Sequence, residues 1–147
     1  MTTTMTDTLA GTTASPDTLE HTTPGQRFLD ALAQLDFAAL GELLAADVWL
    51  RALLPRHLDE HYGSAETAGA FRGWYAAAEA FDALALDHDT VAGKERIRYR
   101  FLLRPDWAPE TWHVIEQMAF LSIKDGLIRK IDLVCTGFVA VDHPHDK

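Results

Sequence analysis

Hydrophobic residues recur at helical spacing in the first part of the chain. Thr23-Pro24 offers a capping residue and then a proline that suits the first turn of a helix. An apolar series follows at the spacing of one helix face: Phe28, Leu29, Leu32 and Leu35. Asp36 is placed to cap a second helix, with its own apolar series at Leu40, Leu43 and Leu44. The pattern predicts two short helices that are nearly continuous.

The hydrophobic pattern then changes to that of a strand. Residues 47–54 are rich in β-forming side chains, and Pro55 ends them. Residues 56–63 indicate an irregular polar segment. Ser64 is expected to cap a third helix with Glu66 in its first turn. The apolar stripe of this helix has a large aromatic component: Ala70, Phe71, Trp74, Tyr75 and Ala78.

The second half of the chain shows the two-residue period of strands. Strands are predicted over 83–91, 95–104, 111–124 and 127–138. They are joined by a turn at 92–94, a loop over 105–109 and an Asp125-Gly126 hairpin turn. The arginines of the second of these strands (Arg96, Arg98 and Arg100) alternate with apolar residues and indicate its solvent or interface side. Helices followed by a run of strands predict an α+β fold, with the helices on one face of the sheet.

The 147 residues and their 48% hydrophobic content fit one domain with a substantial core. We expect this domain over residues 23–139. Residues 1–22 are rich in Thr and poor in apolar side chains, which predicts a disordered tail. Residues 140–147, with His143 and His145, are expected to be frayed.

Charge and cysteine content narrow the classes of partner. A net charge of −9 makes nucleic acids and membrane surfaces, which are themselves anionic, poor candidates as binding partners. Cys135 is the only cysteine, which excludes an intrachain disulfide and a cysteine-based zinc site. The segment before Arg27 contains no Lys or Arg, unlike a signal peptide. No apolar run reaches the roughly 18 residues of a membrane span. We therefore expect a cytoplasmic protein, and we expect neither a metal nor an organic cofactor.

Three stretches resemble a known superfamily: residues 26–40 with 43–47, residues 63–74, and residues 120–128 with their strand, Asp-Gly turn and next strand. They are similar to the nuclear-transport-factor-2-like superfamily, which includes ketosteroid isomerases, limonene epoxide hydrolases, scytalone dehydratases and SnoaL-like polyketide cyclases. The resemblance implies a cone, in which a strongly curved and mostly antiparallel sheet wraps on three N-terminal helices and encloses an apolar pocket. Fold-level likeness does not choose a reaction.

The catalytic side chains of these relatives are missing at the matching positions. A tyrosine of the isomerases is Phe28 here, their general-base aspartate is Ala52, and their oxyanion-hole aspartate is Ala119. An aspartate of the epoxide hydrolases aligns with Leu133, while Asp132 faces the opposite way. The tyrosine expected near Ala52 in scytalone dehydratases is absent too. The chain therefore resembles the cone fold but lacks the catalytic side chains known in these relatives.

Strand alternation predicts which side chains line the pocket instead. If Ala119 faces inward, then His113 and Gln117 do so too. His113 is the candidate general base, and Gln117 the candidate donor to a substrate oxygen. The alternatives are a surface histidine and a glutamine that satisfies neighbouring backbone. The expected substrate-binding walls are Phe28, Trp74, Tyr99, Leu133 and Cys135. Cys135 is either a buried inert thiol or, with a nearby base, a nucleophile.

The opposite face of the same strand carries an apolar row that needs cover: Trp112, Val114, Met118 and Phe120. A homodimer through the sheet would provide it. Glu116 and Asp132 would then pair with arginines on that face. In the competing interpretation, Glu116 and Asp132 are catalytic carboxylates inside the pocket, with Arg98 as their partner.

The segment from residue 56 to residue 62 combines two histidines with two carboxylates. His57 and His61 have a spacing that could place them on one helix face for metal binding. A solvated loop at the mouth of the cone, acting as a lid, is the other interpretation.

Two functions are open at this point. The first is a cofactor-independent enzyme that acts by acid–base chemistry on a small apolar molecule, as a cyclase, isomerase, dehydratase or epoxide hydrolase. The second is a non-catalytic module for ligand binding or dimerisation on the same fold.

Overall fold

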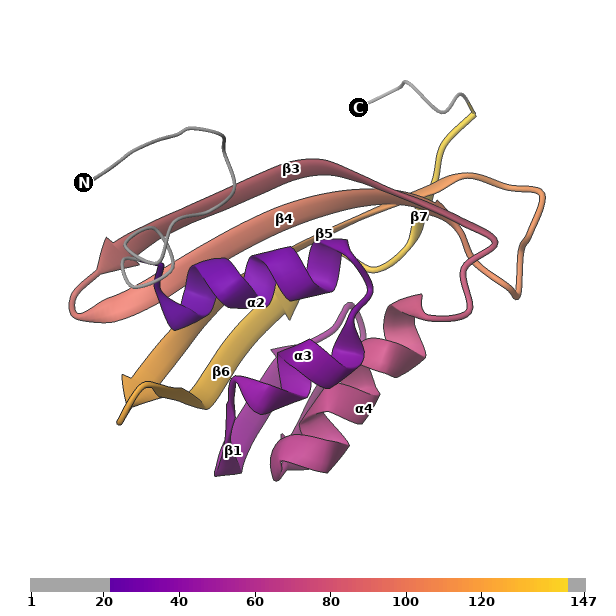
Figure 1. Cartoon of the computed structure of the whole chain (residues 1–147). Helices are drawn as coiled ribbons and strands as arrows, with labels where there is room; N and C mark the ends of the chain where they lie inside the picture. The colour runs from indigo at the N-terminus through magenta and orange to yellow at the C-terminus, as the bar shows by residue number, and fades with distance from the viewer. Residues whose placement is uncertain (1–21, 143–147) are drawn as a thin grey trace, which may run out of the picture.

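The computed structural model describes residues 22–142, in which three helices precede or interrupt a large sheet (Figure 1). The elements are α2 (Pro24–Ala33), α3 (Phe37–Glu42), β1 (Leu44–Leu53), β2 (Leu58–Tyr62), α4 (Ser64–Tyr75), β3 (Ala80–Val91), β4 (Lys94–Arg104), β5 (His113–Lys124), β6 (Leu127–Cys135) and β7 (Val139–Ala140). The predicted tail, apart from Thr22, lies outside the described residues, as do His143 and His145. No helix of the described part is long and apolar enough to cross a bilayer.

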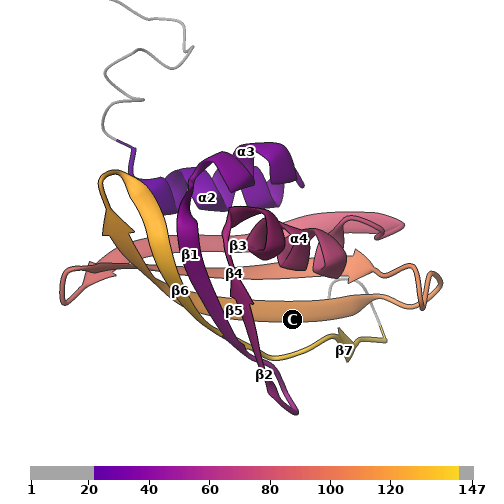
Figure 2. The same cartoon turned by 90° about the horizontal axis from the view of Figure 1, so that it is seen from below.

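The strands form one mixed sheet in the order β2-β1-β6-β5-β4-β3, with β7 paired to β5. Neighbouring strands are antiparallel except β1 and β6, which run parallel. Figure 2 shows that α2, α3 and α4 all lie on one side of this curved sheet. The α+β prediction, with helices on one face of a mostly antiparallel sheet, is confirmed.

Local signals start the first two helices as expected. The Thr23 side chain accepts from the Gln26 amide, and the Gln26 side chain accepts from the Thr23 amide, which completes a capping box. The Asp36 carboxylate accepts from the Ala39 amide at 3.1 Å. The apolar faces that follow are buried against the sheet, and Phe28 contacts Phe71 of α4 edge to face, with ring centroids 5.3 Å apart.

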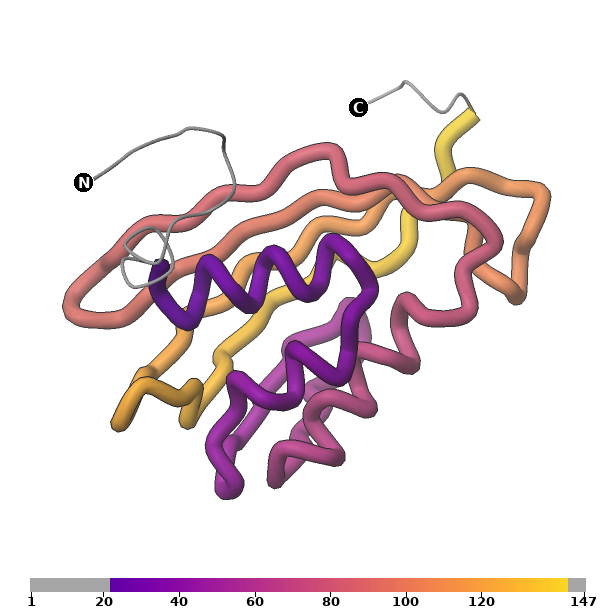
Figure 3. Tube along the Cα trace, viewed as in Figure 1, coloured from indigo at the N-terminus to yellow at the C-terminus, as the bar shows by residue number. Residues whose placement is uncertain are grey.

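A hydrogen-bonded cluster attaches the start of α2 to the tip of the β3–β4 hairpin. Glu95 Oε1 accepts from the Gly25 amide at 3.0 Å and lies 2.7 Å from His88 Nε2. Gly25 is buried there, and a Cβ atom on it would collide with the Glu95 carboxylate. Figure 3 follows the trace of this long hairpin as it passes beside the beginning of α2. The cluster therefore holds one end of the sheet against the helices.

The structure corrects several predicted element boundaries, including the start of β3, which lies at Ala80 rather than at residue 83. Residues 58–62 form the edge strand β2 rather than an irregular segment. The first strand begins at Leu44, not at residue 47, with a register shift before Trp49. The N-cap residue of α4 is Gly63, at φ +91°, rather than the expected Ser64. No side chain forms a capping hydrogen bond at this N-terminal end of the helix. β6 ends at Cys135 because Gly137, at φ +79°, turns the chain toward β7.

Candidate functional site

A cavity of about 320 Å³ opens on the helix side of the sheet, between the end of α4 and strands β5 and β6. We call it the helix-side cavity. Its lining residues are Leu54, Pro55, Arg56, His57, Trp74, Ile115, Gln117, Cys135, Gly137 and Phe138. Among them Gln117 is the one buried polar side chain, at 1% exposure. The lining is otherwise largely apolar, as in sites that bind organic molecules.

Hydrogen bonds on both sides fix the Gln117 amide. The Tyr99 hydroxyl donates to Gln117 Oε1 at 2.5 Å, and Gln117 Nε2 donates to Cys135 Sγ at 3.3 Å. The Gly137 amide also donates to Cys135 Sγ at 3.3 Å. A carboxamide nitrogen carries two N–H groups, so one remains for an acceptor in the cavity. The Gln117 amide is thus an oriented donor in an apolar wall.

Two phenols are buried in the surrounding core, those of Tyr75 and Tyr99. Burial raises the pKa of Tyr99 well above its ordinary value, and it does the same for Tyr75. The Tyr75 hydroxyl has no hydrogen-bond partner among the described residues, and its ring packs edge to face against Trp74 and Phe101. Both phenols therefore stay protonated at neutral pH.

Of the five predicted wall residues, the structure brings two to the cavity. Trp74 and Cys135 line it. Phe28, Tyr99 and Leu133 are buried in the surrounding core, and Tyr99 reaches the site only through its bond to Gln117.

His113 is buried on the predicted inward face at the start of β5. Its Nδ1 donates to the Thr111 carbonyl at 3.0 Å, and its ring contacts Trp107, with centroids 5.0 Å apart. Trp107 also contacts Phe138, which lines the cavity. His113 itself is not among the lining residues, because the first residue of β5 lies beside the 105–112 loop. Its role as general base thus stays a prediction that this geometry does not support.

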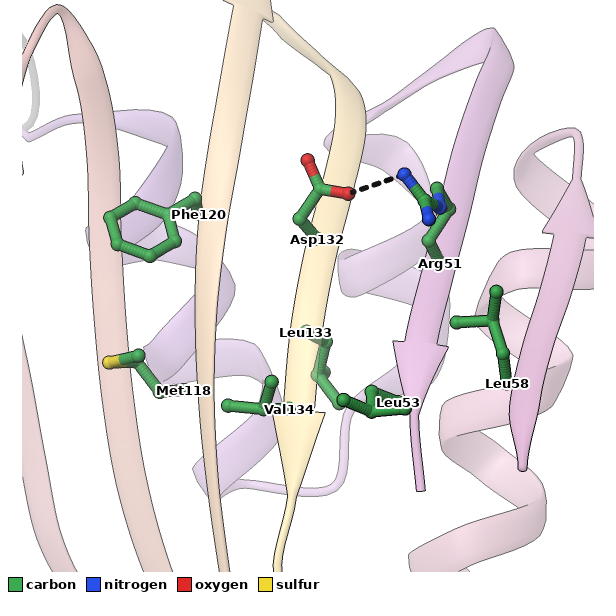
Figure 4. Close-up of a pocket in the computed structure, with 8 residues that line it drawn as sticks. All are labelled: Arg51, Leu53, Leu58, Met118, Phe120, Asp132, Leu133 and Val134. Atoms are coloured by element: carbon green, nitrogen blue, oxygen red, sulfur yellow. Dashed lines mark ion pairs between the residues drawn. The ribbon is translucent and has the colours of Figure 1, made fainter. Parts of the chain in front are cut away.

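Glu116 and Asp132 lie on the outer face of the sheet. Glu116 accepts from Arg100 Nε at 3.1 Å and lies 3.4 Å from an Arg98 nitrogen. Asp132 lies 4.0 Å from Arg51 (Figure 4) and also contacts Lys130. Neither carboxylate lines the helix-side cavity, because alternation along β5 turns Gln117 rather than Glu116 inward, and Asp132 pairs with Phe120 of the outer row.

A second hollow, of about 330 Å³, lies on this outer face (Figure 4). We call it the outer hollow, and it is lined by Arg51, Leu53, Leu58, Met118, Phe120, Asp132, Leu133 and Val134. Most of these side chains are apolar, and Leu53, Leu58 and Val134 are 53%, 44% and 43% exposed. Met118 and Phe120, two of the four residues of the apolar row predicted from the sequence, line it.

The β1–β2 loop supplies cavity residues that sequence reasoning did not assign to the site. His57 lines the cavity, and its Nε2 lies 2.9 Å from Asp59 Oδ1. His61 pairs separately with Glu66, at 3.2 Å. Residues 22–142 contain no cluster of three or more His, Cys, Asp and Glu side chains that could hold a metal ion. The mixed polar composition of the segment was the available signal, but which histidine faces the cavity depends on the turn.

No protein-family model matches this chain, and no curated protein shows significant sequence similarity to it. Solved structures do match. A candidate polyketide cyclase from Xanthomonas campestris pv. campestris superposes with a TM-score of 0.61 at 18% identity, over 76% of this chain and 86% of that one. A protein with a ketosteroid isomerase-like fold from Catenulispora acidiphila, in complex with trimethylamine, gives 0.60 at 18% identity, over 76% and 85%.

An LEH-like epoxide hydrolase from M. tuberculosis also matches, with a TM-score of 0.59 at 15% identity over 76% of this chain and 79% of that one. Identities of this size define architecture and not activity. The shared architecture is the curved sheet with three helices on its inner side. The chain therefore has the nuclear-transport-factor-2-like fold, which it shares with these cyclase, isomerase-like and epoxide hydrolase structures.

Proposed function

We propose that the protein binds a small apolar molecule bearing an oxygen acceptor in the helix-side cavity and acts on it by acid–base chemistry. The reaction would be of the cyclase, isomerase, dehydratase or epoxide-opening type. The observation that carries the proposal is the Gln117 amide, buried in an apolar wall and held by Tyr99 and Cys135. A ligand carbonyl, hydroxyl or epoxide oxygen would accept its remaining N–H.

The size and lining of the cavity support the same proposal. About 320 Å³ lies at the lower end of the range for small-molecule sites, and the walls offer mainly dispersion contacts with Trp74, Ile115 and Phe138. A hydrogen bond inside such a wall is stronger than in water, because the local dielectric is low. A donor that need not reorganise is also the kind of group that stabilises negative charge developing on a substrate oxygen.

Binding of a panel of small cyclic ketones, epoxides and lactones tests the proposal. The wild-type protein and Gln117→Leu would be compared by isothermal titration calorimetry, with the exposed Gln34→Leu as the matched control. We expect at least one ligand class to bind the wild-type protein and Gln34→Leu with equal affinity. Its affinity for Gln117→Leu should be about tenfold or more lower, because one buried hydrogen bond is lost. Equal affinity in all three proteins would contradict the assignment of Gln117.

Turnover decides between an enzyme and a binding module. The apolar Ala52 and Ala119, both fully buried, favour the module because no carboxylate occupies those positions. A ligand that binds through Gln117 and is recovered unchanged after prolonged incubation would establish the module. A product released from the bound ligand would establish the enzyme.

A homodimer through the outer face of the sheet completes the proposal. The exposed Leu53, Leu58 and Val134 adjoin the half-buried Met118 and Phe120, and together they form an apolar surface that a second copy would cover. Arg51 and Asp132 on the same face are complementary charges for a two-fold contact.

A further inference from the structure

We infer that His57 is the general base of the helix-side cavity and that Asp59 positions it. This inference rests on the proposed function, because it assigns the residue that would accept the substrate proton there. Three observations carry it: His57 lines the cavity, its Nε2 lies 2.9 Å from Asp59 Oδ1, and a backbone hydrogen bond from Leu54 to His57 closes the turn between them.

We assign the hydrogen of the neutral His57 ring to Nε2. This nitrogen lies 2.9 Å from Asp59 Oδ1, and a carboxylate oxygen only accepts hydrogen bonds. In the neutral ring the lone pair is then on Nδ1. The Asp59 carboxylate orients the ring, as the aspartate of a catalytic triad orients its histidine. The pair therefore has the chemistry of an oriented base.

Strand pairing and the turn place this pair at the cavity. Asp59 stands opposite Ala52 in the β1–β2 register, and on β2 its half-buried side chain alternates with the exposed Leu58 and Glu60. The Leu54 amide donates to the His57 carbonyl at 2.9 Å, which closes the turn between the strands. Both Leu54 and His57 line the cavity.

The cavity offers no competing base with comparable support. Its other titratable lining groups are Arg56, which is cationic, and Cys135, whose sulfur accepts from Gln117 and Gly137. His113 does not line the cavity. His57 and the Gln117 donor thus border one apolar space, and a bound molecule would meet a base from the turn and a donor from β5.

A model carbon acid tests the inference without knowledge of the natural substrate. In 5-nitrobenzisoxazole, Nδ1 of His57 would take the proton from C3. The C–H electron pair becomes the new bond of the nitrile, the ring N–O bond breaks, and oxygen leaves as a phenolate that accepts from Gln117. The imidazolium returns its proton to water. The coloured cyanonitrophenolate reports the rate.

We expect saturable turnover by the wild-type protein above the buffer reaction. It should fall about tenfold or more in His57→Gln, at the lower edge of what a general base contributes. The matched control is His61→Gln, since His61 lies four residues after His57, pairs with Glu66 and does not line the cavity, and its rate should equal wild type. In Asp59→Asn kcat should fall while KM stays close to the wild-type value, because the imidazole of His57 is no longer held in its orientation.

Equal rates in wild type and His57→Gln, or no wild-type rate above buffer, would overturn the inference. Binding of the unreactive analogue 5-nitrobenzotriazole separates this failure from failure of the proposed function. If the analogue perturbs the NMR signals of Trp74 and Gln117 while His57→Gln leaves the rate unchanged, the proposed binding site is supported and only the assignment of His57 as the base is wrong. If the analogue does not bind to the cavity, both are wrong.

Discussion

At the scale of single residues, the two buried phenols of the core differ in one respect. The Tyr99 hydroxyl donates to Gln117, whereas the Tyr75 hydroxyl has no partner in the described part of the protein. A buried polar group without a partner costs about 1–3 kcal/mol of desolvation, while a bonded one contributes a net gain. Removal of the hydroxyl should therefore change the free energy of unfolding in opposite directions at Tyr75 and Tyr99.

Tyr75→Phe is expected to raise the free energy of unfolding by about 1 kcal/mol, since it removes an unsatisfied hydroxyl. Tyr99→Phe is expected to lower it by about 1–2 kcal/mol, because Gln117 Oε1 loses its donor. Urea unfolding measures both. A loss of stability in Tyr75→Phe as large as that in Tyr99→Phe would show that the Tyr75 hydroxyl has a partner in solution.

The same phenols predict a loss of stability at alkaline pH. Burial raises the folded-state pKa of Tyr75 and Tyr99, so their contribution is complete below the unfolded-state pKa of about 10. Above that pH the unfolded chain loses phenolic protons that the folded protein keeps, and stability falls by up to about 1.4 kcal/mol per pH unit for each residue. Urea unfolding at pH 9, 10 and 11 should show this decline, less steep in Tyr75→Phe. An equal slope in the variant would contradict it.

Residue-level prediction from sequence worked where strand alternation decides the answer. Alternation along one strand is enough to place Gln117 inward and Glu116 outward, as found. It could not show that His113 donates to its own neighbouring backbone, because that depends on the 105–112 loop. It also could not assign His57, whose position depends on a turn that pairs β1 with β2.

At the scale of elements, substitution of two glycines by alanine is expected to change the free energy of unfolding in opposite directions. Gly73 lies in α4 with open space where a Cβ would be, so Gly73→Ala should raise the free energy of unfolding by about 0.5–1 kcal/mol. Gly137 has φ +79°, and a Cβ there would meet Pro55 Cγ at 2.6 Å. Gly137→Ala should therefore cost about 1–2 kcal/mol and open the contact between the β1–β2 loop and the end of β6.

Chemical denaturation of both variants checks this pair, and ligand affinity adds a second readout for Gly137→Ala, since Gly137 lines the helix-side cavity. Gly73→Ala serves as the control of similar chemistry away from that cavity. Unchanged stability in Gly137→Ala would mean that the loop contact is not formed.

Element prediction from sequence failed at β2 for a physical reason. β2 is an edge strand whose side chains are all exposed or half-buried, so it carries no alternating hydrophobic signal. Its pairing comes from the backbone of β1. The long strands β4 and β5, each with a buried face, were predicted to within two residues.

At the scale of the whole molecule, the outer face determines the assembly that we propose. Val134→Lys would place a charge on the exposed apolar surface beside Leu53 and Met118. We expect it to convert a dimer into a monomer in analytical ultracentrifugation, with Leu127→Lys, exposed beside the β5–β6 turn, as the control that stays dimeric. A wild-type protein that is monomeric at high micromolar concentration would contradict the proposal.

The helix-side cavity, with Gln117 as its donor, is where we propose that this protein binds its ligand. The most direct measurement is the two-dimensional NMR spectrum of the protein with each of the cyclic ketones, epoxides and lactones. We expect a bound ligand to shift the side-chain amide signals of Gln117 and the indole signal of Trp74, and to leave residues of the outer hollow such as Arg51 and Met118 unchanged. Shifts confined to the outer hollow would contradict it.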